Sequence, residues 1–224
     1  MWHDAFLVAR KDLNIEANSR VVTNQVIPYA LLVLVLFAFA LDPDRGVLLR
    51  AASGLYWVAV LFSSLLMVQR SHAIESSNGA REALRLSGLD PAGIFLGKAG
   101  AVMVQLLALE IVLGIGVIVL YGVDPGGLGL LAITAVIATW GLAGAGTLYG
   151  ALSSGQRGRE TLLPLLLLPV VAPVLIAATR ASESALTGVS LDVSSGDWIS
   201  LLTVFAVIYT FFGVVAFGPL LEDQ

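Results

Sequence analysis

The sequence contains no cysteine and only two histidines among its 224 residues. Without cysteine, the chain has no disulfide framework and no thiolate metal site. The two histidines, His3 and His72, lie outside the long apolar runs, and a metal or catalytic cluster would need more convergent ligands. We expect His72 to be an exposed loop residue. The sequence also lacks a GxxxxGK[ST] phosphate-binding loop, so the chain cannot hydrolyse ATP by that route.

Charged residues are scarce as well, at 12% of the chain, whereas ordinary soluble domains have about 25%. Hydrophobic residues make up 58% of the sequence, and the mean hydropathy is +0.91. They occur in long blocks, and runs of about 18 or more apolar residues are typical of transmembrane helices. The sequence therefore predicts an all-α polytopic membrane protein.

Six of these blocks are long enough to cross a bilayer, and together they occupy residues 21–219. We expect a short cytoplasmic tail, 220–224, to follow the last of them. The predicted spans are about 21–41, 49–69, 97–121, 128–152, 161–179 and 198–219.

Residues 1–20 are too polar to span a membrane, and their charges do not fit a cleaved signal peptide. Trp2, Phe6, Ala9 and Leu13 share one helical face. We predict an amphipathic helix in the membrane interface. A short polar tail is the alternative.

The basic residues indicate the orientation of the chain, because cytoplasmic loops are enriched in Lys and Arg. Three basic residues, Arg45, Arg50 and Arg180, fall on the side of the odd loops. Nine fall on the side of the termini and even loops, namely Arg10, Lys11, Arg20, Arg70, Arg81, Arg85, Lys98, Arg157 and Arg159. Both termini and the polar loop 70–97 are therefore predicted to be cytoplasmic.

The loop 70–97 is the only long polar segment between apolar runs, and it has internal order. Ser76–Gly79 predicts a turn or a helix start, and Ala80–Leu86 a short helix. Asp90 is placed to cap the next helix, with Pro91 at its first position. A short helix between two membrane spans is either a docking element for a soluble partner or a solvated connector.

Glu110 lies in the middle of the third predicted span. A carboxylate there is costly, so it should face protein or water. It either lines a translocation path or contacts a partner helix, or it is a protonated or hydrogen-bonded group that holds the helices of this chain together.

Two other spans have unusual composition. The fifth contains Pro164, Pro169 and Pro173, each of which removes a backbone donor, so we expect a kinked or discontinuous helix that is either static or part of a moving interface. The fourth is dense in glycine and alanine, which predicts tight helix packing within the subunit or across a dimer.

An ordered set of residues resembles a known family. It comprises Tyr56-Trp57, Ser63-Ser64 at the close of span two, the run Glu75, Gly79, Glu82, Leu86, Leu89, Pro91 and Lys98, and Leu168-Pro169 with Pro173 in span five. This pattern is similar to the heme exporter protein B (CcmB) family of bacterial cytochrome c maturation, and the resemblance covers nearly the whole chain.

The resemblance implies an ABC-2-like permease subunit that works with a separate ATPase subunit. Its other implied partners are a heme-handling membrane subunit, a small single-span subunit and a periplasmic heme chaperone, and a homodimer is possible. In such permeases the loop after span two carries a coupling helix, which here would be roughly Glu75–Leu89. No nucleic acid is implied.

Heme iron is normally held by His, Met, Cys or Tyr, and the predicted spans contain neither histidine nor cysteine. We therefore expect this chain to bind no heme or other cofactor directly and to have no catalytic residues. Three alternatives stay open: an ABC-2 permease for a drug or lipid, a proton-coupled secondary carrier that uses Glu110, and a structural membrane scaffold.

Overall fold

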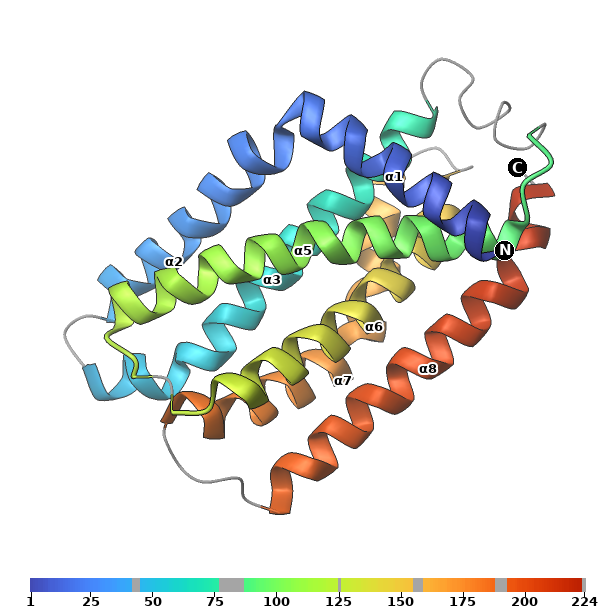
Figure 1. Cartoon of the computed structure of the whole chain (residues 1–224). Helices are drawn as coiled ribbons and strands as arrows, with labels where there is room; N and C mark the ends of the chain where they lie inside the picture. The colour runs from blue at the N-terminus through green and yellow to red at the C-terminus, as the bar shows by residue number, and fades with distance from the viewer. Residues whose placement is uncertain (42–44, 77–86, 125, 155–158, 188–192, 223–224) are drawn as a thin grey trace.

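The computed structural model describes residues 1–41, 45–76, 87–124, 126–154, 159–187 and 193–222. Within these ranges every regular element is helical. Both ends of the described chain lie at the same end of the helix bundle (Figure 1). We refer to this end as the terminal end, and to the other as the distal end.

The first helix, α1 (Trp2–Ser19), lies alongside the beginning of α5 (Pro91–Tyr121). A short π-helical segment, η1 (Val22–Val26), then leads into α2 (Ile27–Leu41). The change from π to α geometry comes next to Pro28, which has no backbone N–H to donate.

The remaining helices are long and cross the bundle from end to end (Figure 1). They are α3 (Arg45–Ser76), α5, α6 (Leu128–Ser154), α7 (Arg159–Thr187) and α8 (Val193–Glu222). Six stretches of the described helices are long and apolar enough to cross a membrane: Val22–Leu41, Gly46–Ala73, Pro91–Tyr121, Leu128–Ser153, Thr161–Glu183 and Gly196–Leu221. The predicted fold class is therefore confirmed.

The core runs along the inner faces of these helices. On α5, Leu106, Leu109 and Leu113 are fully buried at the helical spacing of three and four residues. The outward faces are equally apolar: Phe39, for example, is 77% exposed. A helix that is apolar on all sides is typical of a membrane span, because lipid covers what the bundle does not.

The glycines of α6 allow its neighbours to approach closely, as the composition of this helix predicts. A Cβ on Gly146 would meet Val68 of α3 at 2.7 Å, and one on Gly141 would meet Phe205 of α8 at 3.1 Å. These contacts lie within one chain, so the tight packing of α6 serves the fold of the subunit itself.

Candidate functional site

The terminal end of the bundle is organised around the contact between α1 and α5. Gly93 and Gly97 on α5 are four residues apart and form a flat strip against which Ala5 and Val8 are buried. A Cβ on Gly97 would meet Val8 Cβ at 2.7 Å, so only glycine permits this approach. The arrangement is the small-xxx-small packing common between membrane helices.

The apolar face predicted for α1 points elsewhere. Trp2 is 74% and Phe6 65% exposed, so these two side chains are available to lipid while Ala5 and Val8 contact the protein. The predicted helix is present, and a lipid-facing Trp and Phe fit the expected position in the membrane interface. The sequence pattern did not indicate the second, inward face.

Two acidic residues of α1 extend its contact to both helices that flank the polar loop. Glu16 Oε2 lies 3.7 Å from Arg70 Nε near the end of α3, and the Arg70 guanidinium also donates a hydrogen bond to Ser19 Oγ at 3.2 Å. Asp12 Oδ2 lies 3.9 Å from Nζ of Lys98 on α5, whose side chain is only 2% exposed. Helix α1 therefore connects α3 to α5 through charged groups.

The start of α5 is fixed by the cap that the sequence predicts. Asp90 is the N-cap, its carboxylate accepts a hydrogen bond from Ala92 N at 3.0 Å, and Pro91 is the first helical residue. The backbone N–H of Asp90 donates in turn to Asp4 Oδ2 of α1 at 3.4 Å. Helix α1 therefore also contacts the N-terminus of α5, where the chain returns from the polar loop to the bundle.

The residues predicted to couple the chain to a partner fall mostly beyond the described part. Gly79, Glu82 and Leu86 lie outside the described residues. Glu75 belongs to the last turn of α3, and Leu89 is half-buried just before α5, packed against the cluster that includes Phe95 and Phe217. Both ends of the predicted loop 70–97 are therefore helical.

The expectation that His72 is an exposed loop residue is wrong. Helix α3 continues beyond Arg70 to Ser76, so His72 lies inside a helix and is buried. Its Nδ1 lies 3.0 Å from the carbonyl oxygen of Val68, and its ring packs where Gly150 of α6 has no side chain. The missed signal is that this polar stretch keeps a helical pattern after the apolar run ends.

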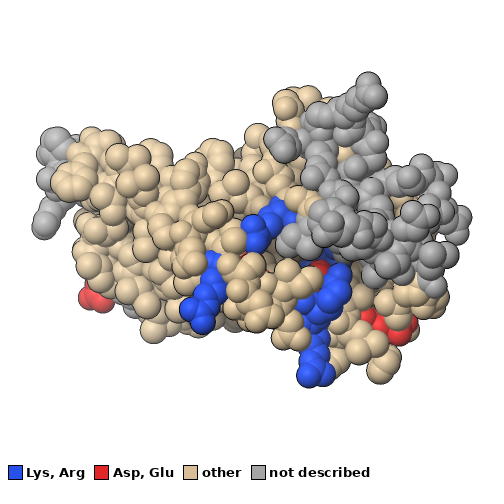
Figure 2. Space-filling model, turned by 90° about the horizontal axis from the view of Figure 1, so that it is seen from above, with Lys and Arg blue, Asp and Glu red and all other residues tan. Residues whose placement is uncertain are grey.

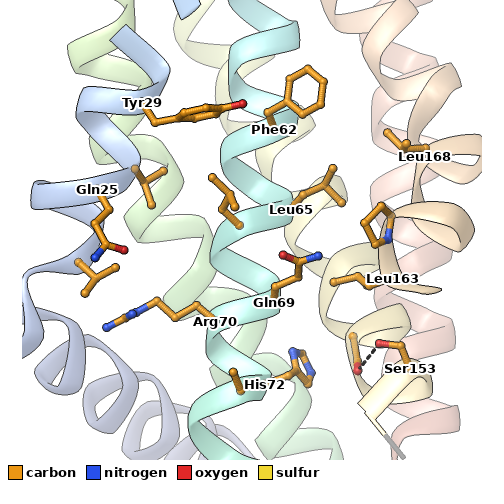
Figure 3. Close-up of a pocket in the computed structure, with 16 residues that line it drawn as sticks. Gln25, Tyr29, Phe62, Leu65, Gln69, Arg70, His72, Ser153, Leu163 and Leu168 are labelled. Atoms are coloured by element: carbon orange, nitrogen blue, oxygen red, sulfur yellow. Dashed lines mark hydrogen bonds between the residues drawn. The ribbon is translucent and has the colours of Figure 1, made fainter. Parts of the chain in front are cut away.

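A cavity of about 970 Å³ opens between α2, α3 and α7 at the terminal half of the bundle (Figure 3). Its polar side chains, which lie toward one end, are Gln25, Gln69, Arg70, His72 and Ser153. The aromatic rings of Tyr29 and Phe62 lie toward the other end. This cavity therefore has a polar end near α1 and an apolar part within the membrane-spanning region. Such a shape suits an amphiphilic molecule or the surface of another membrane helix.

The face seen in Figure 2 carries Lys and Arg side chains from the middle of the molecule toward the terminal end, and none at the distal end. Of the described basic residues, Arg10, Lys11, Arg20, Arg70, Lys98 and Arg159 belong to the terminal half, and Arg45, Arg50 and Arg180 to the distal half. The fold thus gathers on one end the charges that the sequence assigned to one side of the membrane.

Glu110 faces the interior of the bundle. It is 4% exposed, its Oε1 accepts a hydrogen bond from the hydroxyl of Thr139 on α6, and the phenol of Tyr56 on α3 also interacts with this carboxyl. The carboxyl therefore links three spans, and Thr139 and Tyr56 are polar partners that spacing along the chain could not reveal. Gln105 lines a separate small pocket beside Asp12 and Glu16, so it does not share this cluster.

Pro164, Pro169 and Pro173 all lie inside α7, which runs without a break from Arg159 to Thr187. Of the two forms expected for this span, the discontinuous helix is therefore excluded. Pro164 also lines the cavity of about 970 Å³, beside Leu163 and Leu168, so this helix forms one wall of that cavity.

Six membrane-spanning helices, one polar end and a cavity open between spans define a polytopic α-helical membrane protein. Comparison with known proteins narrows this class. The family model described as "CcmB protein" matches residues 3–221. The chain belongs to the CcmB family, as the resemblance in the sequence predicts, and is a multi-pass protein of the bacterial inner membrane.

Curated relatives match most of the chain. The chain is 29% identical to "Heme exporter protein B" of Pseudomonas aeruginosa over 215 residues, which cover 95% of this chain and 94% of the relative. It is 28% identical to the protein of that name from Haemophilus influenzae over 212 residues, covering 95% and 92%. The Escherichia coli K12 protein of that name is 34% identical over 173 residues, covering 73% and 74%.

Proposed function

We propose that this chain is the permease subunit of an ABC transporter complex for cytochrome c maturation, in which it couples ATP hydrolysis by a separate ATPase subunit to motion within the membrane. The observation that carries the proposal is the family match over residues 3–221, together with relatives named heme exporter protein B. The chain itself has no catalytic role, and its terminal end faces the cytoplasm.

The geometry of the terminal end supports this role. The segment between α3 and α5 is where a cytoplasmic ATPase would dock, and α1 is bound to both helices that flank it through Glu16–Arg70 and Asp12–Lys98. A displacement of this segment would therefore move α3, α5 and α1 together, rather than one helix alone. Since α3 and α5 run through the bundle, the displacement passes into the membrane.

Heme is handled by partner subunits in this proposal, and this chain does not ligate the iron. His72 is buried between α3 and α6, with its ring against Gly150. The partners are a heme-handling membrane subunit, a small single-span subunit and a periplasmic heme chaperone. A second copy of this chain is a further possible partner.

A co-purification experiment tests the docking role of the segment. The ATPase subunit is co-expressed with wild-type chain, with Glu82→Arg in the polar loop, and with Asp124→Arg in the turn after α5. Asp124 is exposed at the distal end and serves as the matched charge-reversal control. We expect wild type and Asp124→Arg to retain the ATPase in mild detergent and Glu82→Arg to lose it, at equal membrane insertion.

Capture of the ATPase by all three proteins would show that docking occurs elsewhere, and capture by none would remove the ABC assignment. A permease for a drug or lipid would give the same pattern, but its activity would not depend on the heme chaperone.

The buried Glu110 favours a second candidate, a proton-coupled carrier. Transport that survives loss of the ATPase and is lost in Glu110→Gln would support that carrier instead.

A further inference from the structure

A second cavity, of about 440 Å³, lies in the distal half of the bundle between α3, α5, α6 and α7. Tyr56 and Trp57 line it from α3, Glu110 and Gly114 from α5, and Ser182 from α7. Its volume is within the range of about 300–1,000 Å³ typical of small-molecule sites. Its lining is almost entirely apolar apart from these few polar groups, as such sites usually are.

The polar groups of this cavity differ in whether they have hydrogen-bond partners. The indole N–H of Trp57 donates to Ser182 Oγ at 3.0 Å, and Ser182 donates to the carbonyl of Ala178 at 2.7 Å. Glu110 Oε1 accepts from Thr139. Its second oxygen, Oε2, is buried and has no hydrogen-bond partner among the described residues. A buried acceptor left in this state is costly, so a donor is expected to occupy the cavity.

The carboxyl group of Glu110 narrows the chemistry of that donor. A carboxylate within a membrane span requires a positive partner or a water-filled cavity. No Lys or Arg of the described chain pairs with it, and its neighbours Thr139 and Tyr56 carry neutral hydroxyl groups. A protonated amine would donate the missing hydrogen bond, and it would also be the positive partner that the ionised form of Glu110 requires.

The cavity is also reached from the lipid. Ile111, Ile115 and Ile118 belong to its lining and are exposed on the outer surface of α5. A transmembrane helix is about 10–12 Å across with its side chains, which is too wide to enter a space of this size. A single apolar chain or small ring system can enter it. The cavity therefore suits a molecule dissolved in the bilayer rather than a partner helix.

We propose that this cavity binds a lipophilic amine from the bilayer, with its protonated nitrogen at Glu110 Oε2 and its apolar body between α5 and α6. Glu110 is the residue that selects the cation, and Gly114, one turn further along α5, leaves the space that the apolar body fills. A Cβ built on Gly114 meets no atom within 4 Å. This site goes beyond the proposed coupling to an ATPase, and it lies away from the α1 contact.

Quenching of Trp57 fluorescence tests the proposal, because this indole lines the cavity. The other three of the chain's four tryptophans, Trp2, Trp140 and Trp198, are replaced by phenylalanine. The full chain is reconstituted in nanodiscs of a zwitterionic lipid and titrated with a long-chain primary amine brominated on its chain. The probe for comparison is the brominated alcohol of the same length. We expect saturable quenching by the amine, with a Kd at least tenfold lower than for the alcohol.

Three variants in the same background separate a site from simple partition into the bilayer. Glu110→Gln should raise the Kd of the amine at least tenfold, and Gly114→Leu should remove saturable quenching because the added side chain fills the cavity. Gly100→Leu is the matched control: it is on the same helix, its Cβ also meets no atom within 4 Å, and it does not line the cavity. It should bind as wild type does.

Quenching that rises linearly with either probe, or that is the same in Gly114→Leu as in wild type, would overturn the proposal. Equal saturable binding of amine and alcohol would assign the cavity to bilayer lipid chains and would also overturn it. Should Glu110→Gln fail to fold, the comparison between Gly114→Leu and Gly100→Leu still decides whether the amine occupies this cavity.

Discussion

At the scale of single residues, Phe95 shows how closely the spans depend on glycine. Its ring is fully buried at the beginning of α5 and lies directly over Gly213 of α8, where a Cβ would overlap the ring. Phe95 also packs against Phe217 one turn further along α8, with ring centroids 5.7 Å apart. The absence of a side chain at Gly213 is therefore what lets α5 and α8 meet at this point.

We predict that Gly213→Ala destabilises the protein, although alanine is the better helix former. The added methyl group displaces a fully buried ring, and overpacking of this kind costs about 1–3 kcal/mol. The measurement is the midpoint of thermal unfolding in detergent. Gly218→Ala is the control, since its Cβ would lie 3.7 Å from Pro91 in an ordinary contact. Equal midpoints for the two variants would contradict the predicted contact.

The residue scale also shows where sequence reasoning stops. The position of Glu110 within a span predicts that it faces protein or water, and it is buried as expected. Its partners Thr139 and Tyr56 belong to two other helices, α6 and α3. Hydropathy assigns residues to spans, but which spans touch depends on packing, so these partners could not be predicted.

At the scale of elements, α1 differs most from its prediction. The sequence predicts its helix and its outward apolar face, both of which follow from periodicity. The inward face consists of Ala5 and Val8, and two apolar side chains are too few to form a periodic pattern of their own. The strip they contact, Gly93 and Gly97, is a visible small-xxx-small pattern, but such a pattern does not say which helix packs against it.

We predict that Gly97→Leu releases α1 from the bundle. A side chain at this position would meet Val8 and the backbone of Ala5. Helix α1 could then no longer pack against α5, and it would unfold locally more often. Trypsin should then cleave after Arg10 and Lys11 at least several-fold faster, as followed by mass spectrometry. Gly100→Leu, whose Cβ faces open space, should be cleaved at the wild-type rate. Unchanged cleavage in Gly97→Leu would mean that α1 is held elsewhere.

At the scale of the whole molecule, the six spans and their lengths are the part that the sequence predicts well, because about 20 apolar residues are needed to cross a bilayer. Helices α3 and α7 are longer than the predicted spans, since polar turns at both of their ends continue the helix beyond the apolar run. The order in which the helices pack, and the cavities that result, depend on side-chain shape and were not predictable.

The orientation of the molecule can be tested directly, because the chain has no cysteine of its own. We predict that a membrane-impermeant maleimide labels Asp124→Cys and Asp197→Cys in cells whose outer membrane is permeable to the reagent. Ser87→Cys should be labelled only after the inner membrane is opened. All three positions are exposed, and Ala143→Cys, which is buried, should resist labelling in both conditions. Labelling of Ser87→Cys in intact cells would reverse the orientation inferred from the basic residues.

The contact between α1 and α5 has a consequence for how the protein is made. Val8 leaves the ribosome 89 residues before Gly97, from 97 − 8, and two membrane spans are synthesised in between. At about 5–20 residues per second this interval lasts about 4–18 s. The first helix to be synthesised must therefore wait at the membrane surface until the start of α5 emerges. The Trp2 and Phe6 side chains that stay outside the finished bundle are suited to hold it there during that time.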